Sequence, residues 1–363
     1  MGFSDFHGNA HVVTQLREML GLGRLPQGVI LAGPAGAGKY TLAQMMAKAM
    51  NCLEPPKGKL PDFCGKCSNC VRIAQADDLD VRFAEAVEAR DNLRDADKKD
   101  TRILIQTHPE VLIIPPDPPQ MLIKIGQVRR VIETIYYRPG DARERVYIFT
   151  DSAFMKEAAN SLLKVLEEPP EFASLFLLTT NPGELLPTIR SRALTFTLGA
   201  LPAAEIEHDL AKRRPEWNAK QRALVARLSG GAIGRARSFD LATYMAARKD
   251  ALTLLTTAIE AKDHSELFRA TETYRAGAEG KARTDDLLHT LALLLQDLLY
   301  LGSGAKDLLS NADIAGELTR LAERIDFAWI TAAAQGLDEV HSGMRRNLLR
   351  SLSLDAFATS LER

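Results

Sequence analysis

Two groups of residues in the first half of the chain have types and spacings that could support chemistry. Gly33, Gly36 and Gly38 precede Lys39 in the pattern Gly-x-x-x-x-Gly-Lys, which binds nucleotide phosphates where it joins a strand to a helix. The glycines let backbone N–H groups turn toward the phosphates, and the following helix adds its positive end. The lysine would reach the β and γ oxygens. The sequence therefore predicts a phosphate-binding loop at 33–39.

Two positions of this predicted nucleotide site carry residues unsuited to hydrolysis. Tyr40 stands where a small Ser or Thr hydroxyl binds Mg²⁺, and Thr41 follows one residue late. Asp151 ends an apolar strand as the expected magnesium-side carboxylate, but Ser152 comes next, where an active ATPase has a glutamate base. The loop therefore either binds nucleotide with little turnover or is a relic that binds nothing.

The second group consists of the only four cysteines among the 363 residues. Cys52, Cys64, Cys67 and Cys70 would supply four thiolates, which suit tetrahedral Zn²⁺ in a closed structural site. In a reducing compartment, clustered cysteines are more often metal ligands than disulfides. An iron–sulfur cluster is the chemical alternative, and four unrelated free thiols is another. The spacing favours a structural metal site with zinc as the ion.

A further candidate lies in the run Ile189-Arg190-Ser191-Arg192, which follows an apolar strand ending in Thr179. An arginine at the edge of a nucleotide domain can reach a γ-phosphate bound on a neighbouring subunit and stabilise transition-state charge in trans. A surface arginine paired with a carboxylate is the alternative, and spacing alone favours it.

The elements that must position these residues alternate between strand and helix over residues 1–200. Helices are predicted at Thr41–Met50 and at Ala153–Glu168, the second stopped by Pro169-Pro170. The alternation predicts an α/β domain with a parallel sheet covered on both faces. Four apolar runs bounded by Pro, Gly or Asp are the expected buried strands, at 29–32, 111–114, 146–150 and 175–179.

The composition changes after Leu201-Pro202, and no strand is predicted beyond that point. The rest is rich in Ala, Leu, Glu and Arg with helical periodicity, and helix breaks are expected at Gly230-Gly231 and at 277–280. We therefore expect a small helical lid domain over 201–243 and a larger helical domain over 244–363. Leucines between positions 287 and 299 form an apolar stripe that indicates a core-facing helix.

The bulk composition excludes several classes of protein. A hydrophobic content of 46% allows more than one core, and a net charge of -1 excludes a generally polycationic nucleic-acid coat. No signal-peptide-like run or stretch of membrane-spanning length is present, so we expect a cytoplasmic protein. Residues 74–107 mix many charges with few large apolar groups, which is typical of a solvated insertion or a charged helix.

Five sequence runs stand out beside the phosphate loop and the four cysteines. The runs are Phe6-His7-Gly8-Asn9, Gly23-Arg24-Leu25-Pro26-Gln27-Gly28, Thr107-His108-Pro109-Glu110, Asn160-Ser161-Leu162-Leu163-Lys164-Val165-Leu166-Glu167-Glu168-Pro169-Pro170 and Ile189-Arg190-Ser191-Arg192. Together these motifs resemble bacterial clamp-loader subunits of the DNA polymerase III holoenzyme, an AAA+ family. The resemblance covers residues 3–200 with specific motifs, whereas the helical remainder fits only in length and character.

The resemblance implies an AAA+ module at 1–200 that carries a zinc knuckle (52–70), followed by the lid and by a helical collar that holds a pentameric ring together. The stator subunit of such a ring presents the arginine of a Ser-Arg-Cys motif to ATP on an adjacent motor subunit. This role would fall to Arg192, although Ala193 replaces the cysteine. Thr180 would be the polar sensor, and Gly234 holds the position of the lid sensor, with Arg235 and Arg237 nearby. Implied partners are the gamma or tau motor subunits, the delta subunit, the sliding clamp and primed DNA, with Zn²⁺ and ATP/Mg²⁺ as cofactors.

Tyr40 and Ser152 favour a stator over a motor, because the motor subunits keep the loop hydroxyl and an Asp-Glu pair. We therefore expect weak or absent ATP hydrolysis. A gamma/tau-like ATPase motor is the alternative, and a zinc-dependent nucleic-acid binding module is a third hypothesis, although near-neutral charge argues against strong DNA binding by the chain alone. No carboxylate pair suited to two-metal phosphoryl transfer is present, so no polymerase site is expected.

Overall fold

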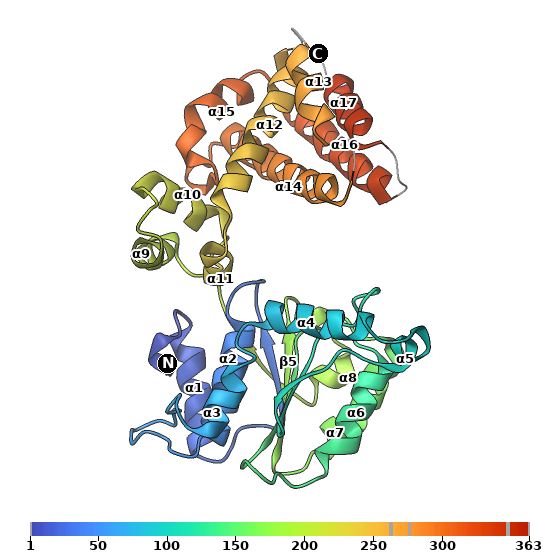
Figure 1. The fold of residues 1–363 in the computed structure, drawn as a ribbon. Coiled ribbons are helices and arrows are strands. Elements are labelled where there is room, and N and C mark those ends of the chain that lie inside the picture. The colour runs from blue at the N-terminus through green and yellow to red at the C-terminus, as the bar shows by residue number, and fades with distance from the viewer. Residues whose placement is uncertain (1, 261–263, 275–276, 346–348, 362–363) are drawn as a thin grey trace. The chain divides into compact units, whose positions relative to one another are not determined.

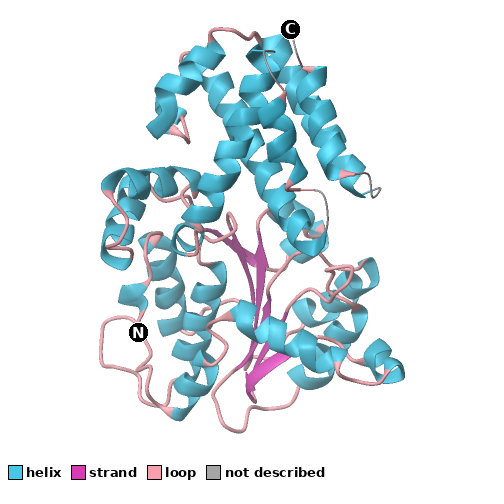
Figure 2. Cartoon of the chain, turned by 45° about the horizontal axis from the view of Figure 1, so that its top comes forward, coloured by secondary structure: helices cyan, strands magenta, loops and turns pink. Residues whose placement is uncertain are grey.

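The computed structural model describes residues 2–260, 264–274, 277–345 and 349–361 (Figure 1). The chain divides into two compact units, one of Met1–Leu201 with Gly231–Arg235 and the other of Pro202–Gly230 with Ala236–Arg363. All strands of the described chain belong to the first unit (Figure 2). The first unit therefore positions the phosphate loop, the cysteines and Arg192.

A six-stranded sheet in the order β2-β3-β4-β5-β1-β6 forms the centre of the first unit. The prediction of a parallel sheet is confirmed for five strands. It is wrong for the edge strand β2, which pairs antiparallel with β3. The connection between β2 and β3 is too short for the crossover that parallel strands need. The strands are β1 (Gly28–Ala32), β2 (Ile105–His108), β3 (Val111–Ile114), β4 (Arg145–Phe149), β5 (Ala173–Thr179) and β6 (Leu194–Thr197).

Successive residues of the central strands β1, β3, β4 and β5 face two different cores, as the two-residue period of a strand requires. In β1, Val29 and Leu31 belong to one core and Ile30 to the other. Helices α1 (Ala10–Gly21), α2 (Lys39–Asn51) and α3 (Ser68–Ala74) cover the first face, and α6 (Ile125–Ile135) and α7 (Lys156–Glu167) cover the second (Figure 1). The predicted covering of both faces is thus confirmed.

Helix α7 begins three residues later than the sequence predicts. Phe154 makes a parallel bridge to Ile123, so the chain at Ala153 is still extended. After α7, the short elements η2 (Pro182–Glu184) and α8 (Pro187–Arg190) lead from β5 to β6. A first short helical turn, η1 (Phe3–Asp5), packs near the amino terminus.

The charged insertion folds as two helices, α4 (Leu79–Asp91) and α5 (Asp95–Asp100). No residue of α4 is fully buried. Arg90 nevertheless reaches the loop after β3, where its Nη1 lies 2.5 Å from Oδ1 of the fully buried Asp117. A carboxylate removed from water needs such a partner, and Lys124 lies 3.6 Å from the same oxygen. The ion pair fixes the end of α4 to the sheet domain.

The second unit is helical, and no strand occurs among its described residues. The boundary predicted near residue 243 falls two residues inside α12 and remains a prediction. The helices of residues 202–363 are α9 (Ala203–Arg213), α10 (Ala219–Leu228), α11 (Ile233–Arg237), α12 (Leu241–Glu260), α13 (Ser265–Glu272), α14 (Gly277–Gly302), η3 (Lys306–Leu308), η4 (Ala312–Ile314), α15 (Ala315–Ala322), α16 (Phe327–Arg345) and α17 (Arg350–Ser360).

One of the two predicted helix breaks is confirmed. Gly230 and Gly231 separate α10 from α11 with φ angles of 59° and 82°, which glycine adopts without strain. The second break lies a few residues earlier than predicted: α13 ends at Glu272, and residues 277–280 are already the first turn of α14. The apolar stripe that follows provides the packing that stabilises this helix through its glycines.

The core of the second unit is built around α14. The predicted leucine stripe is confirmed, since Leu287, Leu291, Leu294 and Leu298 are all fully buried. The same helix also buries Asp297, which accepts hydrogen bonds from the backbone of Ser310 and Asn311 and was not predicted.

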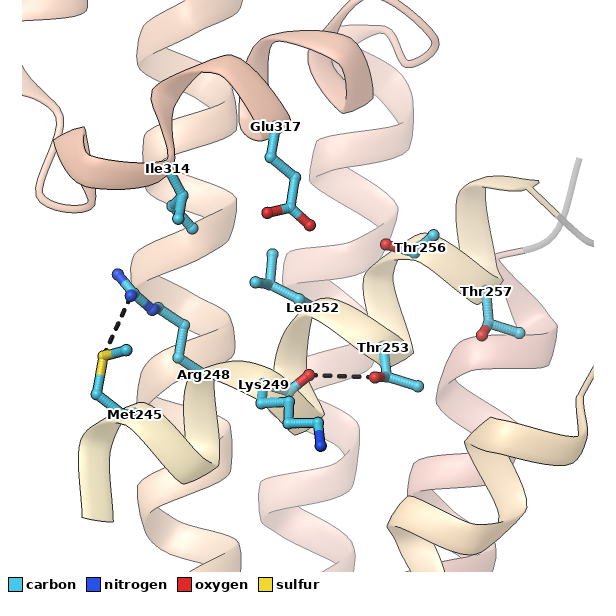
Figure 3. Close-up of a pocket in the computed structure, with 9 residues that line it drawn as sticks. All are labelled: Met245, Arg248, Lys249, Leu252, Thr253, Thr256, Thr257, Ile314 and Glu317. Carbon is cyan, nitrogen blue, oxygen red and sulfur yellow. Dashed lines mark hydrogen bonds between the residues drawn. The ribbon is translucent and has the colours of Figure 1, made fainter. Parts of the chain in front are cut away.

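An open pocket of about 390 Å³ lies beside α12 in this unit (Figure 3). Its Arg248 is held by two hydrogen bonds to Asp313 and by contact with the sulfur of Met245, so the guanidinium is already engaged. Among the described residues, no helix has both the length and the apolar character needed to cross a membrane.

Candidate functional site

The predicted phosphate loop connects the carboxyl end of β1 to the first residue of α2. Gly33, Gly36 and Gly38 all have positive φ angles, of 146°, 79° and 90°. A Cβ at Gly33 would lie 2.5 Å from the carbonyl oxygen of Leu198, so no other residue fits there. The glycines therefore have the conformational role that the sequence pattern implied.

Lys39 and Asp151 come together at this end of the sheet. The Lys39 Nζ donates to the carbonyl oxygens of Gly33 and Pro34, at 2.6 and 2.9 Å. Burial lowers the pKa of Lys39, while the nearby Asp151 carboxylate acts in the opposite direction. The Lys39 ammonium group thus lies over the loop. Its hydrogen bonds to the two carbonyl oxygens must break before it can bind a phosphate.

The loop is also in contact with the segment 231–235. The carbonyl oxygen of Gly36 accepts a hydrogen bond of 2.8 Å from the N–H of Gly234. A Cβ on Gly234 would lie 2.7 Å from that oxygen, and a Cβ on Gly36 would lie 2.8 Å from Cγ of Arg235. Glycine at position 234 is therefore explained by close packing on the phosphate loop.

The two arginines close to Gly234 differ in their surroundings. Arg235 is exposed and lies against the phosphate loop. Arg237 instead donates from Nε and Nη2 to the buried carboxylate of Asp209, both at 2.8 Å. These hydrogen bonds hold the pKa of Asp209 below its usual value, although burial opposes them. Arg237 is thus committed to an ion pair within the second unit.

Tyr40 has a structural contact in place of a magnesium-binding hydroxyl. Its phenol donates to the carbonyl of Ala76 beyond α3 and accepts a hydrogen bond of 2.8 Å from Gln44. Burial raises the pKa of this phenol, so the group stays protonated. The Tyr40 oxygen is therefore directed at the segment that carries the cysteines, and Thr41 is exposed on α2.

Replacing Tyr40 with phenylalanine should lower the free energy of unfolding by about 1–2 kcal/mol, because the Ala76 carbonyl and the Gln44 amide each lose a partner. Chemical denaturation at neutral pH measures the change. Tyr137→Phe is the matched control, because Tyr137 is 66% exposed and its hydroxyl makes no hydrogen bond among the described residues. Equal stability of the two variants would contradict a structural role for Tyr40.

Ser152 is likewise part of a local network. Its hydroxyl donates to Glu184 at 2.7 Å and lies 3.0 Å from the hydroxyl of Thr179. Thr179 is buried, whereas the predicted sensor Thr180 and Asp151 are exposed. Sequence reasoning missed Thr179 and Glu184, since two adjacent threonines cannot be told apart by type and Glu184 comes from a separate turn.

The four cysteines converge on one point. Their sulfur atoms all lie within 4.8 Å of one another, which is close enough to hold one metal ion. Backbone N–H groups of Cys64 and Cys67 point at the sulfurs of Cys52 and Cys64, each at 3.3 Å. Gly65 makes the turn between them with a φ of 70°. The donor set and its N–H···S contacts fit a thiolate metal centre.

The Cys67 thiol is more acidic than the thiols of Cys52 and Cys70. Burial alone would raise its pKa, but hydrogen bonds from the backbone of Cys70 and Leu53 bring it down to about 6. Cys52 and Cys70 are buried, and this burial raises the pKa of both thiols. A bound cation would be the natural partner for the thiolates.

Arg192 lies beside the amino-terminal ends of β1 and β6, whereas the phosphate loop lies at the carboxyl-terminal end of β1. It precedes β6, whose first residue Leu194 pairs with Val29 at the start of β1, while the loop follows the end of β1. The Arg192 side chain is about one-third exposed, and its Nη2 lies 2.7 Å from Oε1 of Glu167. The carboxylate partner that sequence analysis considered as an alternative is therefore present.

Two family models match the chain. Residues 8–202 match the one described as "DNA polymerase III, delta subunit", and residues 243–355 match the one described as "DNA polymerase III, delta subunit, C terminal". The chain belongs to the DNA polymerase III delta-subunit family. It is thus a clamp-loader subunit with the α/β AAA+ fold and a helical C-terminal region, as the sequence resemblance implied.

Curated relatives of this delta-family chain carry the names of other subunits. DNA polymerase III subunit tau of Escherichia coli is 32% identical over 209 residues, which are 57% of this chain and 27% of that protein. Subunit gamma of Buchnera aphidicola subsp. Acyrthosiphon pisum is 30% identical over 205 residues, or 56% and 47%. The chain thus spans about a quarter to a half of the length of these relatives.

Two solved structures are similar to this delta-family chain. A DNA polymerase III gamma subunit-related protein from Thermotoga maritima has a TM-score of 0.40 at 19% identity, covering 96% of this chain and 98% of that one. The DNA clamp loader delta protein of Bacillus subtilis has a TM-score of 0.30 at 12% identity, covering 96% and 99%.

Proposed function

We propose that this chain is a delta-prime-like stator of the replicative clamp loader. It helps the ATP-driven loading of the sliding clamp onto primed DNA by supplying Arg192 to a nucleotide on a neighbouring motor subunit. The observation that carries the proposal is the use of Tyr40 and Ser152 in structural hydrogen bonds, at the two positions where a motor binds Mg²⁺ and activates water.

The position of Arg192 supports action in trans. The five residues of β1 separate the arginine from the phosphate loop of its own chain, a distance of about 16 Å at roughly 3.3 Å per strand residue. An arginine side chain does not span that distance along the sheet. This geometry favours a phosphate on another subunit as the target of Arg192. That subunit would approach the amino-terminal ends of β1 and β6.

We further propose that any nucleotide on the chain itself would be held with little turnover. Its ligands would be Gly33, Gly36, Gly38, Lys39, Thr41, Asp151 and Thr180. The hydrogen bonds of Lys39 to loop carbonyls and of Gly234 to Gly36 must rearrange before a triphosphate binds, which weakens its affinity.

The proposed partners are the gamma or tau motor subunits, the delta subunit, the clamp and primed DNA. Residues 201–243 would act as the lid and 244–363 as the collar that holds the subunits together. Zn²⁺ on Cys52, Cys64, Cys67 and Cys70 is the proposed structural ion. We assign no polymerase chemistry to the chain.

A gamma/tau-like motor is the second candidate, favoured by the names of the relatives and by the nearby Lys39 and Asp151. Reconstitution distinguishes the two. ATP hydrolysis is measured for this chain alone, and for motor, delta and clamp on primed DNA with and without it. We expect no measurable ATP hydrolysis by the chain alone, and strong stimulation of ATP hydrolysis when the chain is added to the mixture. Steady turnover by the chain alone, abolished by Lys39→Ala, would establish the motor instead.

A further inference from the structure

Arg192 is restrained within its own subunit by the carboxylate of Glu167, at the end of α7. We propose that Glu167 is a positioning residue that competes with the neighbouring phosphate for this guanidinium, so that the arginine engages only when a triphosphate displaces the carboxylate. This inference rests on the proposed role of Arg192 in trans and deepens it.

The restraint involves both terminal nitrogens of the guanidinium. Nη2 lies 2.7 Å from Glu167 Oε1, while Nη1 donates to the carbonyl of Thr188 at 2.9 Å and lies 3.3 Å from Ser191 Oγ. An arginine grips a phosphate best through two parallel N–H groups. At least one of the present contacts must therefore break before a two-point phosphate contact can form. Glu167 is the charged partner of Arg192 in the described part of the chain.

The position of Glu167 follows from the packing of the backbone, not from the conformation of one side chain. A Cβ added at Gly28 would lie 3.1 Å from the carbonyl oxygen of Arg192, 3.2 Å from Cβ of Ala193 and 3.2 Å from Cδ2 of Leu166. Leu166 is buried, and the next residue is Glu167. The missing side chain of Gly28 thus lets the end of α7 and the arginine segment meet at the start of β1.

The exposure of the pair suits an exchange of partners. The Arg192 side chain is 34% exposed and that of Glu167 is 50% exposed. An ion pair with this much solvent contact is weak, so a multiply charged phosphate can replace the carboxylate. A phosphate and a carboxylate offer the same kind of acceptor to the guanidinium, and the two partners therefore exclude each other.

Glu167→Gln tests the competition in the reconstituted complex of motor, delta, clamp and primed DNA. We expect kcat/KM for ATP to rise about two- to five-fold, the range that a partly exposed ion pair corresponds to, and the gain to shrink as salt is added. Glu168→Gln is the matched control, because Glu168 is the adjacent exposed carboxylate and its side chain makes no ion pair among the described residues. It should leave kcat/KM unchanged.

The same substitution is made in the Arg192→Ala background, where it should have no effect on kcat/KM. Assembly by gel filtration and thermal stability should match the parent, which separates a restraint from a folding defect. An unchanged or lower kcat/KM for Glu167→Gln, with Arg192→Ala still strongly defective, overturns the competition and leaves the arginine role standing. An Arg192→Ala complex as active as the parent overturns the proposed function itself.

Discussion

Replacing Arg192 with alanine is expected to abolish most of the ATP hydrolysis that this chain stimulates in the reconstituted clamp loader. An arginine supplied in trans contributes about 10³–10⁵ to the rate of phosphoryl transfer at the site it completes. Sites completed by other subunits keep their own arginines. The expected loss of ATP hydrolysis therefore equals the full contribution of one site. The loss becomes larger if the sites hydrolyse ATP in a concerted cycle.

Single-turnover hydrolysis on primed DNA measures this loss directly, and clamp loading measured in parallel should fall with it. Arg190→Ala is the matched control, because Arg190 is an exposed arginine of the same short segment, two residues away. It should retain nearly full activity. If both variants behave alike, the segment acts through its shape or general charge, and the assignment to Arg192 is wrong.

The sequence predicted those parts of the fold that rest on continuous local patterns. The phosphate loop could be placed because glycines at fixed spacing have few other uses between a strand and a helix, and β1, β3, β4 and β5 could be placed because they are apolar on both faces. The strands β2 and β6 were missed. In β6 only Phe196 is buried, and in β2 only the two end residues are, so neither has an apolar run.

The contacts that give the candidate site its character depend on residues far apart in the sequence. Tyr40 could be recognised as unsuited to Mg²⁺, but its bond to Ala76 required the fold of the cysteine segment. Ser152 could be recognised as a poor base, yet its partner Glu184 lies in another turn. Glu167 belongs to a run that the sequence identified as the end of a helix and as a family motif, but its approach to Arg192 depends on Gly28. Type and spacing thus identify candidates, while tertiary packing decides their partners.

Removal of the proposed zinc ion should destabilise the first unit strongly. Cys52 ends α2 and Cys67 precedes α3, while Cys52 and Cys70 belong to the first core, so one ion would join two helices, a long loop and the sheet. A structural zinc site is worth about 10–16 kcal/mol in isolated zinc-finger peptides, where folding depends entirely on the metal. Part of this energy is replaced here by apolar packing, so we expect partial rather than complete unfolding.

The purified protein should contain one zinc per chain by elemental analysis. A strong chelator should lower the thermal unfolding temperature, and added Zn²⁺ should restore it, because an ion that binds only the folded state stabilises it by mass action. Replacement by Co²⁺ should give the thiolate absorption of a tetrahedral all-sulfur site. Cys64→Ser should lose the ion, whereas Lys66→Ala, an exposed position between two of the cysteines, should keep it.

The two alternatives to zinc, an iron–sulfur cluster and four free thiols, predict different results for the same samples. An iron–sulfur cluster would give coloured protein with iron and sulfide in place of zinc, and it would leave the position of the four cysteines unchanged. Four free thiols would react with a thiol reagent in the native protein at rates limited only by their burial. Added Zn²⁺ would not slow this reaction. If the metal-free protein unfolds at the same temperature as the purified one, the four cysteines make no metal-dependent contribution to the fold, and the knuckle is held by its apolar contacts and N–H···S bonds alone.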